Sequence, residues 1–88
     1  MDIPKKLKIG PLTYEVIFSP DISNGGEIDA EKQEIKINSN HTKEYRELAL
    51  WHEIIHAINS EFNEREAEYL AQAIYMVLKE NELWQIKK

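Results

Sequence analysis

The segment from residue 51 to residue 58 constrains this chain more than any other, because it places two histidines four residues apart in an apolar helical pattern. It reads Trp-His-Glu-Ile-Ile-His-Ala-Ile, so that Glu53 directly follows His52, and His56 comes one helical turn later. Residues four apart on an α-helix lie on the same face, one above the other. The pattern therefore predicts a helix on which two imidazoles point the same way and can bind one ion.

The spacing of the two histidines favours a zinc site with a glutamate at its edge. The pattern His-Glu-x-x-His on a helix binds zinc through its histidines, and its glutamate acts as general base towards the water that zinc activates. We therefore predict His52 and His56 as metal ligands and Glu53 as the catalytic residue. The alternative is a packed pair of histidines on a helix surface, with Glu53 as an ordinary solvated carboxylate.

Length and composition limit the remaining choices. The 88 residues predict one domain, 1–88, with a small core. The chain has no cysteine, so disulfides and thiolate ligands are excluded, and any metal is bound by nitrogen and oxygen. The net charge of −5 argues against a nucleic-acid partner. No uncharged stretch approaches the roughly 20 residues of a membrane span, and the start lacks a signal peptide, which indicates a cytoplasmic protein with no membrane partner.

Four short strands are predicted ahead of the histidine helix. Residues 7–9 and 12–18 flank a Gly-Pro turn, and residues 27–29 and 34–38 form a second predicted hairpin. Between the hairpins, residues 19–26 are rich in Pro, Asp, Ser, Asn and Gly, and we interpret them as a plain connecting loop, with a role in gating substrate as the alternative. The predicted fold class is α+β, with a small, mostly antiparallel sheet of about four strands packed on two antiparallel helices.

The two helices are predicted from apolar spacing and capping residues. The first covers about residues 43–59, and the second covers about residues 64–80. Asn63 and Glu66 resemble a capping box at the start of the second helix, and in the tail beyond it Trp84 is expected to fold back onto the core. The apolar residues of the second helix that are expected to face the core are Ala67, Leu70, Ala71, Ile74, Val77 and Leu78.

A third zinc ligand is expected from the second helix. Catalytic zinc usually takes three protein ligands and leaves a fourth position for water. When the two antiparallel helices are paired about residue 60, His56 stands level with Glu64, and His52 stands level with Glu68. We assign Glu64 to the metal and Glu68 to the ring N–H of His52, whose tautomer it would fix. The reverse assignment of the two glutamates is the alternative.

With these assignments the chain resembles metallopeptidases of the gluzincin type. Residues 52–56, His-Glu-Ile-Ile-His, match the zinc helix of that group, and residues 64–68, Glu-Arg-Glu-Ala-Glu, resemble its downstream Glu-x-x-Ala-Asp/Asn segment. The resemblance implies that Glu64 binds zinc and that Glu68, in place of the usual Asp or Asn, holds a ligand histidine. The order of strands, zinc helix and ligand helix is also similar to small phage-encoded and bacterial metallopeptidases of broadly ImmA/IrrE type, which implies a minimal zincin-like domain.

The predicted function is that of a zinc-dependent metallopeptidase, in which zinc-activated water attacks a peptide bond and Glu53 is the general base. The predicted cofactor is Zn²⁺. The predicted partners are a peptide or protein substrate, extended along residues 34–38, and a protein partner or second copy that completes the cleft. His41, Tyr45 and Tyr75 are candidates to stabilise the oxyanion. The alternatives are a non-catalytic, metal-stabilised binding or regulatory module of phage type and a metal-free helical hairpin.

Overall fold

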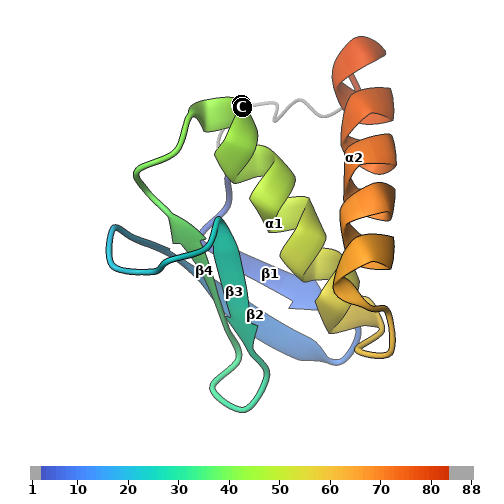
Figure 1. Ribbon diagram of the computed structural model, residues 1–88. Coiled ribbons are helices and arrows are strands. Elements are labelled where there is room, and N and C mark those ends of the chain that lie inside the picture. The colour runs from blue at the N-terminus through green and yellow to red at the C-terminus, as the bar shows by residue number, and fades with distance from the viewer. Residues whose placement is uncertain (1–2, 84–88) are drawn as a thin grey trace.

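The computed structural model describes residues 3–83 and contains four strands and two helices (Figure 1). Each predicted element is present, with ends that differ from the predicted ones by one residue at most, and the α+β class is confirmed. Trp84, which was expected to fold back onto the core, lies outside the described residues. The elements are β1 (Lys6–Ile9), β2 (Leu12–Ser19), β3 (Gly26–Asp29), β4 (Glu34–Asn38), α1 (Lys43–Ile58) and α2 (Glu64–Glu80).

The sheet is mixed, with the strand order β1-β2-β4-β3. The two hairpins, β1 with β2 and β3 with β4, are antiparallel as predicted, whereas β2 and β4 are parallel, with Val16 opposite Ile35. This parallel pairing makes β4 an inner strand and leaves β1 and β3 at the edges. The expectation that a substrate extends along residues 34–38 is therefore wrong, because β4 is already hydrogen-bonded to a neighbour on each side.

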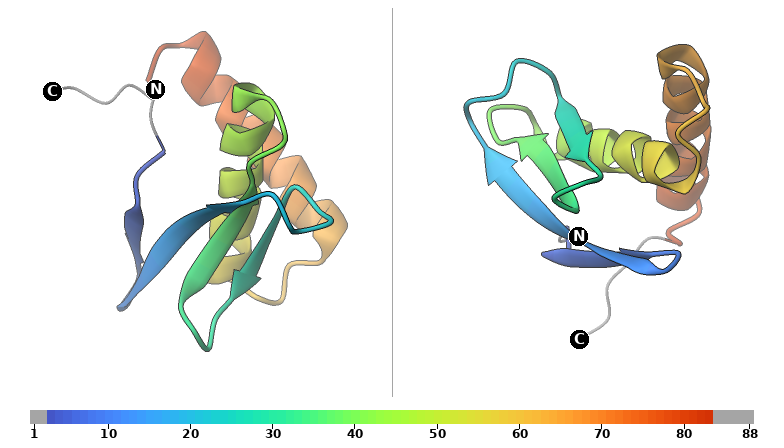
Figure 2. Two further views of the ribbon diagram at one scale, coloured as in Figure 1. Left: turned by 90° about the vertical axis from the view of Figure 1, so that its left-hand side faces the viewer. Right: turned by 90° about the horizontal axis from the view of Figure 1, so that it is seen from below.

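Helix α1 lies between the sheet and α2, and it packs apolar side chains against both (Figures 1 and 2). Leu50 belongs to the core above the sheet, together with the fully buried Ile35. On its other side, Ile55 packs with Ala67 and Ala71 of α2, which are small enough to let the two helices approach closely. Helix α1 is thus covered on two faces, and the side chains of His52 and His56 on it are only 12% and 15% exposed.

The start of α2 is fixed by its capping residues. The Asn63 side chain accepts a hydrogen bond from the backbone N–H of Glu66, and the Glu66 carboxylate accepts one from the N–H of Asn63. This is the predicted capping box, which satisfies backbone donors that the first helical turn leaves unpaired. Residues 59–63 alone join the helices, so the first turn of α2, which begins with Glu64, lies against the C-terminal half of α1.

The outward face of α2 is more apolar than expected. Ala67 and Ala71 are buried as predicted, but Ile74 and Val77 have exposed fractions of 37% and 55%. The prediction that Ile74 and Val77 face the core is wrong, because α2 packs on α1 and not on the sheet. Helix α1 covers only a narrow stripe of α2. The apolar residues of α2 form a wider stripe, so some of them stay exposed.

A buried carboxylate joins the C-terminal half of α2 to α1. Glu47 of α1 is fully buried, and its Oε1 accepts a hydrogen bond of 2.6 Å from the Tyr75 hydroxyl and lies 3.5 Å from Lys79 Nζ. Its Oε2 has no hydrogen-bond partner among the described residues. Burial, followed by the hydrogen bond to Glu47, raises the pKa of Tyr75 well above its usual value. Tyr75 is thus held between the helices.

The Glu47–Tyr75 hydrogen bond predicts a difference between two tyrosines of α2. Tyr75→Phe should lower the free energy of unfolding by about 1–3 kcal/mol, because a buried carboxylate loses its donor. Tyr69→Phe removes the same hydroxyl from a side chain that is 76% exposed, and it should change the free energy by about 0.5 kcal/mol at most. Urea denaturation followed by circular dichroism measures both. Equally small effects would show that this bond does not support the helix pair.

Candidate metal centre

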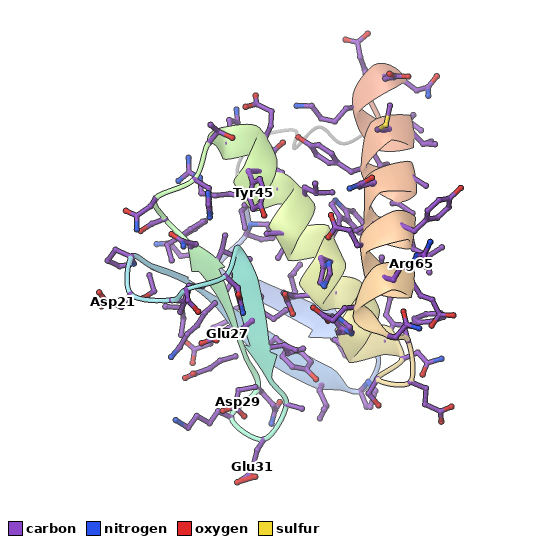
Figure 3. The ribbon with its side chains drawn as sticks, viewed as in Figure 1. Asp21, Glu27, Asp29, Glu31, Tyr45 and Arg65 are labelled. Atoms are coloured by element: carbon purple, nitrogen blue, oxygen red, sulfur yellow. The ribbon has the colours of Figure 1, made fainter. Side chains whose placement is uncertain are left out.

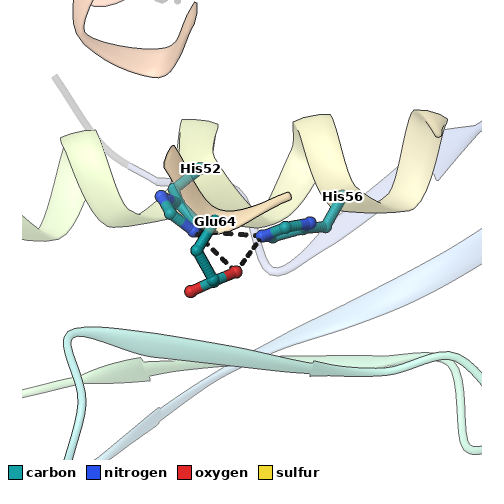
Figure 4. A group of neighbouring side chains, drawn as sticks. All are labelled: His52, His56 and Glu64. Atoms are coloured by element: carbon teal, nitrogen blue, oxygen red, sulfur yellow. Dashed lines mark hydrogen bonds and ion pairs between the residues drawn. The ribbon is translucent and has the colours of Figure 1, made fainter. Parts of the chain in front are cut away.

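Three potential metal ligands meet where α1 passes the first turn of α2 (Figure 4). The Nε2 atoms of His52 and His56 are 3.1 Å apart. Oε1 of Glu64 lies 2.5 Å from Nε2 of His56 and 3.5 Å from Nε2 of His52. The histidines come from successive turns of α1, and Glu64 is the first residue of α2. The structure therefore brings together the three residues that the sequence predicts as ligands.

The distances between the three atoms suit one small cation. Two ligands of a tetrahedral zinc ion, each about 2.0–2.2 Å from the metal, are about 3.3–3.6 Å from each other. The His52–His56 and His52–Glu64 distances are close to this value, and the His56–Glu64 distance is shorter. The Glu64 side chain is 83% exposed, so a small movement of its carboxylate can open the short distance. The donor set therefore fits a divalent metal ion.

The orientation of His52 is set by Glu68. Nδ1 of His52 lies 2.9 Å from Oε2 of Glu68, and an ionised carboxylate can only accept a hydrogen bond. We therefore assign the ring proton to Nδ1, which leaves the lone pair of Nε2 directed at the other two ligands. Gln72 donates its side-chain amide to Oε1 of Glu68 at 3.0 Å and steadies that carboxylate. Glu68 thus lies beside a candidate ligand and outside the ligand group, where the sequence prediction places it.

The candidate centre favours a positive charge. The lone pair of His52 Nε2 and an oxygen of Glu64 converge on the same point, and two acceptors so placed repel each other unless a cation or an added proton lies between them. The slight burial of Glu64 acts to raise its pKa, but the contacts of its carboxylate with the His52 and His56 rings, which are strongest when a ring carries an added proton, outweigh burial and hold this pKa below its usual value. A divalent ion and a protonated histidine are the two species that satisfy the geometry.

Glu53 is buried beside the centre and lacks a hydrogen bond within the described part of the chain. Its exposed fraction is 6%. It packs against Gly26 of β3, where an added Cβ would stand 3.3 Å from Oε2 of Glu53. Burial raises the pKa of Glu53 to about 7, the charge of His52 lowers it, and the charges of Glu64 and Glu27 raise it. A carboxyl group with such a pKa can take up and release protons near neutral pH.

Two adjacent cavities open on either side of Glu53. The first, which we call the Tyr45 cavity, has a volume of about 420 Å³ and is lined by residues of the N-terminal half of α1, among them Tyr45. The second, which we call the Ile58 cavity, has a volume of about 650 Å³ and is lined by the C-terminal end of α1. Together they form a groove past the candidate centre. Both linings include Asn24, Gly26, Glu53 and Glu64.

The loop of residues 19–26 lines both cavities, although the sequence analysis interprets it as a plain connector. Asn38 of β4 holds it in place, because its side-chain amide donates to two loop carbonyls, one of them that of Asn24, at 3.0 Å each. A Cβ at Gly25 would stand 2.6 Å from a carbon of the Tyr45 ring. Sequence reasoning did not assign these residues to the site, and the adjacent Gly25 and Gly26 at the start of β3 are the signal of close backbone approach that could have found them.

Two of the three residues proposed for oxyanion stabilisation lie at the groove. His41 and Tyr45 both line the Tyr45 cavity, and their ring centroids are 4.4 Å apart. Tyr45, which lies near the start of α1, is labelled in Figure 3. Tyr75 lines neither of the two cavities, because its hydroxyl is directed at Glu47. The structure therefore leaves His41 and Tyr45 as candidates and removes Tyr75.

Comparisons of the chain with protein-family models, with curated proteins and with solved structures found no match. The likeness to gluzincin metallopeptidases therefore rests on residues 52–56 and 64–68 and stays a prediction. The geometry of His52, His56 and Glu64 is that of a group that could hold a metal ion.

The contact between Glu68 and His52 predicts a loss of metal affinity when it is removed. Glu68→Ala should weaken Zn²⁺ binding by about 10- to 100-fold, because the His52 ring loses the acceptor that fixes its tautomer. Glu80→Ala removes the same charge from the last turn of α2 and should leave the affinity unchanged. Competition with a chromophoric chelator at pH 7 measures both variants. Equal affinities in the two variants would contradict the assigned role of Glu68.

Proposed function

We propose that the chain is a zinc-dependent metallopeptidase, with His52, His56 and Glu64 as zinc ligands and Glu53 as general base. The observation that carries the proposal is the convergence of three ligand atoms within 4.8 Å of one another, beside a buried carboxylate that lines an open groove. Two imidazoles and one carboxylate are a donor set of catalytic zinc, and they leave one position open for water or substrate.

The proposed mechanism divides the work between the ion and Glu53. A zinc ion held by His52, His56 and Glu64 would supply Lewis acidity for polarising a peptide carbonyl and for activating water. Glu53 takes a proton from the attacking water on a carboxylate oxygen and passes it to the nitrogen of the leaving amine as the C–N bond breaks. Its burial and its lack of a hydrogen-bond partner among the described residues leave its oxygens available for this transfer. Glu68 keeps Nε2 of His52 directed at the centre.

The outer edge of β3 suits an extended peptide substrate better than β4 does. β3 is an edge strand, and its first residue, Gly26, packs against Glu53. The backbone groups of an edge strand that point away from the sheet can pair with an added strand. A peptide bound there would run along the groove, and the candidate oxyanion donors His41 and Tyr45 would lie at one end of it.

A second candidate function is that of a metal-stabilised binding or regulatory module without turnover. The ligands come from both helices, so a bound ion would join α1 to α2 and add its binding energy to the stability of the fold. The exposure of Glu64 favours this reading, because the centre lies at the surface.

No helix in the described residues is long and apolar enough to cross a membrane. A cytoplasmic location and a partner that completes the cleft are further parts of the proposal.

Substitution of Glu53 separates the two functions. Glu53→Gln keeps the size of the side chain, so it should retain one zinc per chain while the cleavage rate falls by about 10²- to 10⁴-fold. The rate is measured with a mixture of fluorogenic peptides, and zinc is measured by elemental analysis. Glu80→Gln, which makes the same change far from the groove, is the control and should keep both zinc and activity.

The zinc content of the wild-type chain and the His56→Ala variant distinguish the other possible functions. Zinc at one equivalent in the wild-type chain, with no cleavage of any peptide, would favour the non-catalytic module. His56→Ala should lose zinc under both metal-dependent functions, because it removes one of three ligands. If the wild-type chain binds no zinc and His56→Ala changes neither stability nor activity, the cluster is a metal-free contact between the helices.

A further inference from the structure

The groove beside the candidate centre is lined by glutamates, and among residues 3–83 no lysine or arginine lines it to balance their charge. Glu53 is the strongest single indication of a ligand, because it is more than nine-tenths buried, lines both cavities and has no hydrogen-bond partner in the described chain. A buried, unpaired carboxylate favours an occupant that brings positive charge or hydrogen-bond donors. The carboxylates that line the groove are Glu27, Glu53, Glu64 and Glu68.

The Tyr45 cavity also offers apolar surface next to these charges. Leu48 and Ala49 of α1 line it together with the Tyr45 ring, and the half-exposed Glu68 lies in the same lining. A lysine or arginine side chain has the matching chemistry, since its aliphatic stem packs on apolar surface while its charged end stays near carboxylates. An aromatic ring adds a cation–π attraction to such a group. An aspartate or glutamate side chain would meet like charges in the same place.

We infer that the Tyr45 cavity selects peptides that place lysine or arginine in it and rejects peptides that place aspartate or glutamate there. The inference rests on the proposed function, because the candidate centre and Glu53 would hold the reacting peptide bond beside this cavity. A divalent ion adds two positive charges, and three carboxyl groups line the cavity, so the bound ion does not give the lining an excess of positive charge. Selection then comes from repulsion of acidic side chains as well as from attraction of basic ones.

The test measures binding and not turnover. Fluorescein-labelled peptides that differ at one position, Lys, Arg, Met or Glu, are N-methylated at the neighbouring amide so that they resist cleavage, and their dissociation constants for the zinc-loaded chain are obtained by fluorescence anisotropy. The Lys and Arg peptides should bind about 5- to 10-fold more tightly than the Met peptide, and the Glu peptide should bind more weakly than Met. The preference should shrink as salt screens the charges.

Two matched variants locate the preference in the Tyr45 cavity. Ser23→Lys introduces an ammonium group at an exposed position of the lining, so the Lys and Arg peptides should lose their advantage. Ala73→Lys adds the same charge to the exposed side of α2, away from both cavities, and should keep the advantage. Met and Lys peptides that bind equally well to the wild-type chain would overturn the inference, as would equal effects of the two lysine substitutions.

The side-chain preference in binding and the cleavage of peptides are measured separately, so one can fail without the other. If the wild-type chain binds zinc and cleaves peptides but shows no preference for Lys or Arg, the inference fails and the proposed function stands. If the chain prefers Lys and Arg peptides and Ser23→Lys removes that preference, the inference is supported even when no peptide is cleaved, and the groove then serves a binding module.

Discussion

The contact between the first turn of α2 and the middle turns of α1 is the constraint on which the candidate site depends. It brings a carboxylate of Glu64 to two Nε2 atoms that helical spacing already places side by side. The Asn63 capping box fixes where α2 begins, and the short connection of residues 59–63 keeps the first turn of α2 close to the end of α1. At the opposite end of the helix pair, the buried Glu47 and Tyr75 hold the same packing. The site is thus produced by the helix pair, and the sheet supplies the second wall of the groove.

Much of the local structure could be predicted from the sequence because its signals are local. Apolar alternation marks the strands, and the spacing of His52 and His56, together with pairing of antiparallel helices about residue 60, predicts the positions of Glu64 and Glu68 next to the histidines, where the structure has them. The sheet order could not be predicted in the same way. Two hairpins can be joined along either of their edges, and the pairing of β2 with β4 is a contact between strands distant in sequence. The wrong substrate edge and the misplaced Ile74 and Val77 both follow from tertiary packing that periodicity does not report.

The groove could not be predicted from the sequence patterns, because it is formed by contacts between segments that are distant in the sequence. The loop of residues 19–26 reads as a connector because its composition is that of any turn-rich segment. Its role as a wall depends on Asn38, whose amide holds the loop carbonyls, and on two glycines that allow the backbone to approach Tyr45 and Glu53. These contacts shape the space beside the candidate centre, so in the proposed enzyme they would set the selectivity of the groove, and the histidine helix would supply its chemistry.

We propose that a zinc ion between the two helices is bound by two imidazoles and one carboxylate, and X-ray absorption at the zinc edge of the chain loaded with one equivalent of zinc measures these ligands. We expect about four nitrogen or oxygen neighbours at about 2.0–2.2 Å, with the outer-shell scattering of two imidazole rings, which should weaken in His56→Ala because one ring is removed. A spectrum without imidazole scattering, or a spectrum that His56→Ala leaves unchanged, would contradict it.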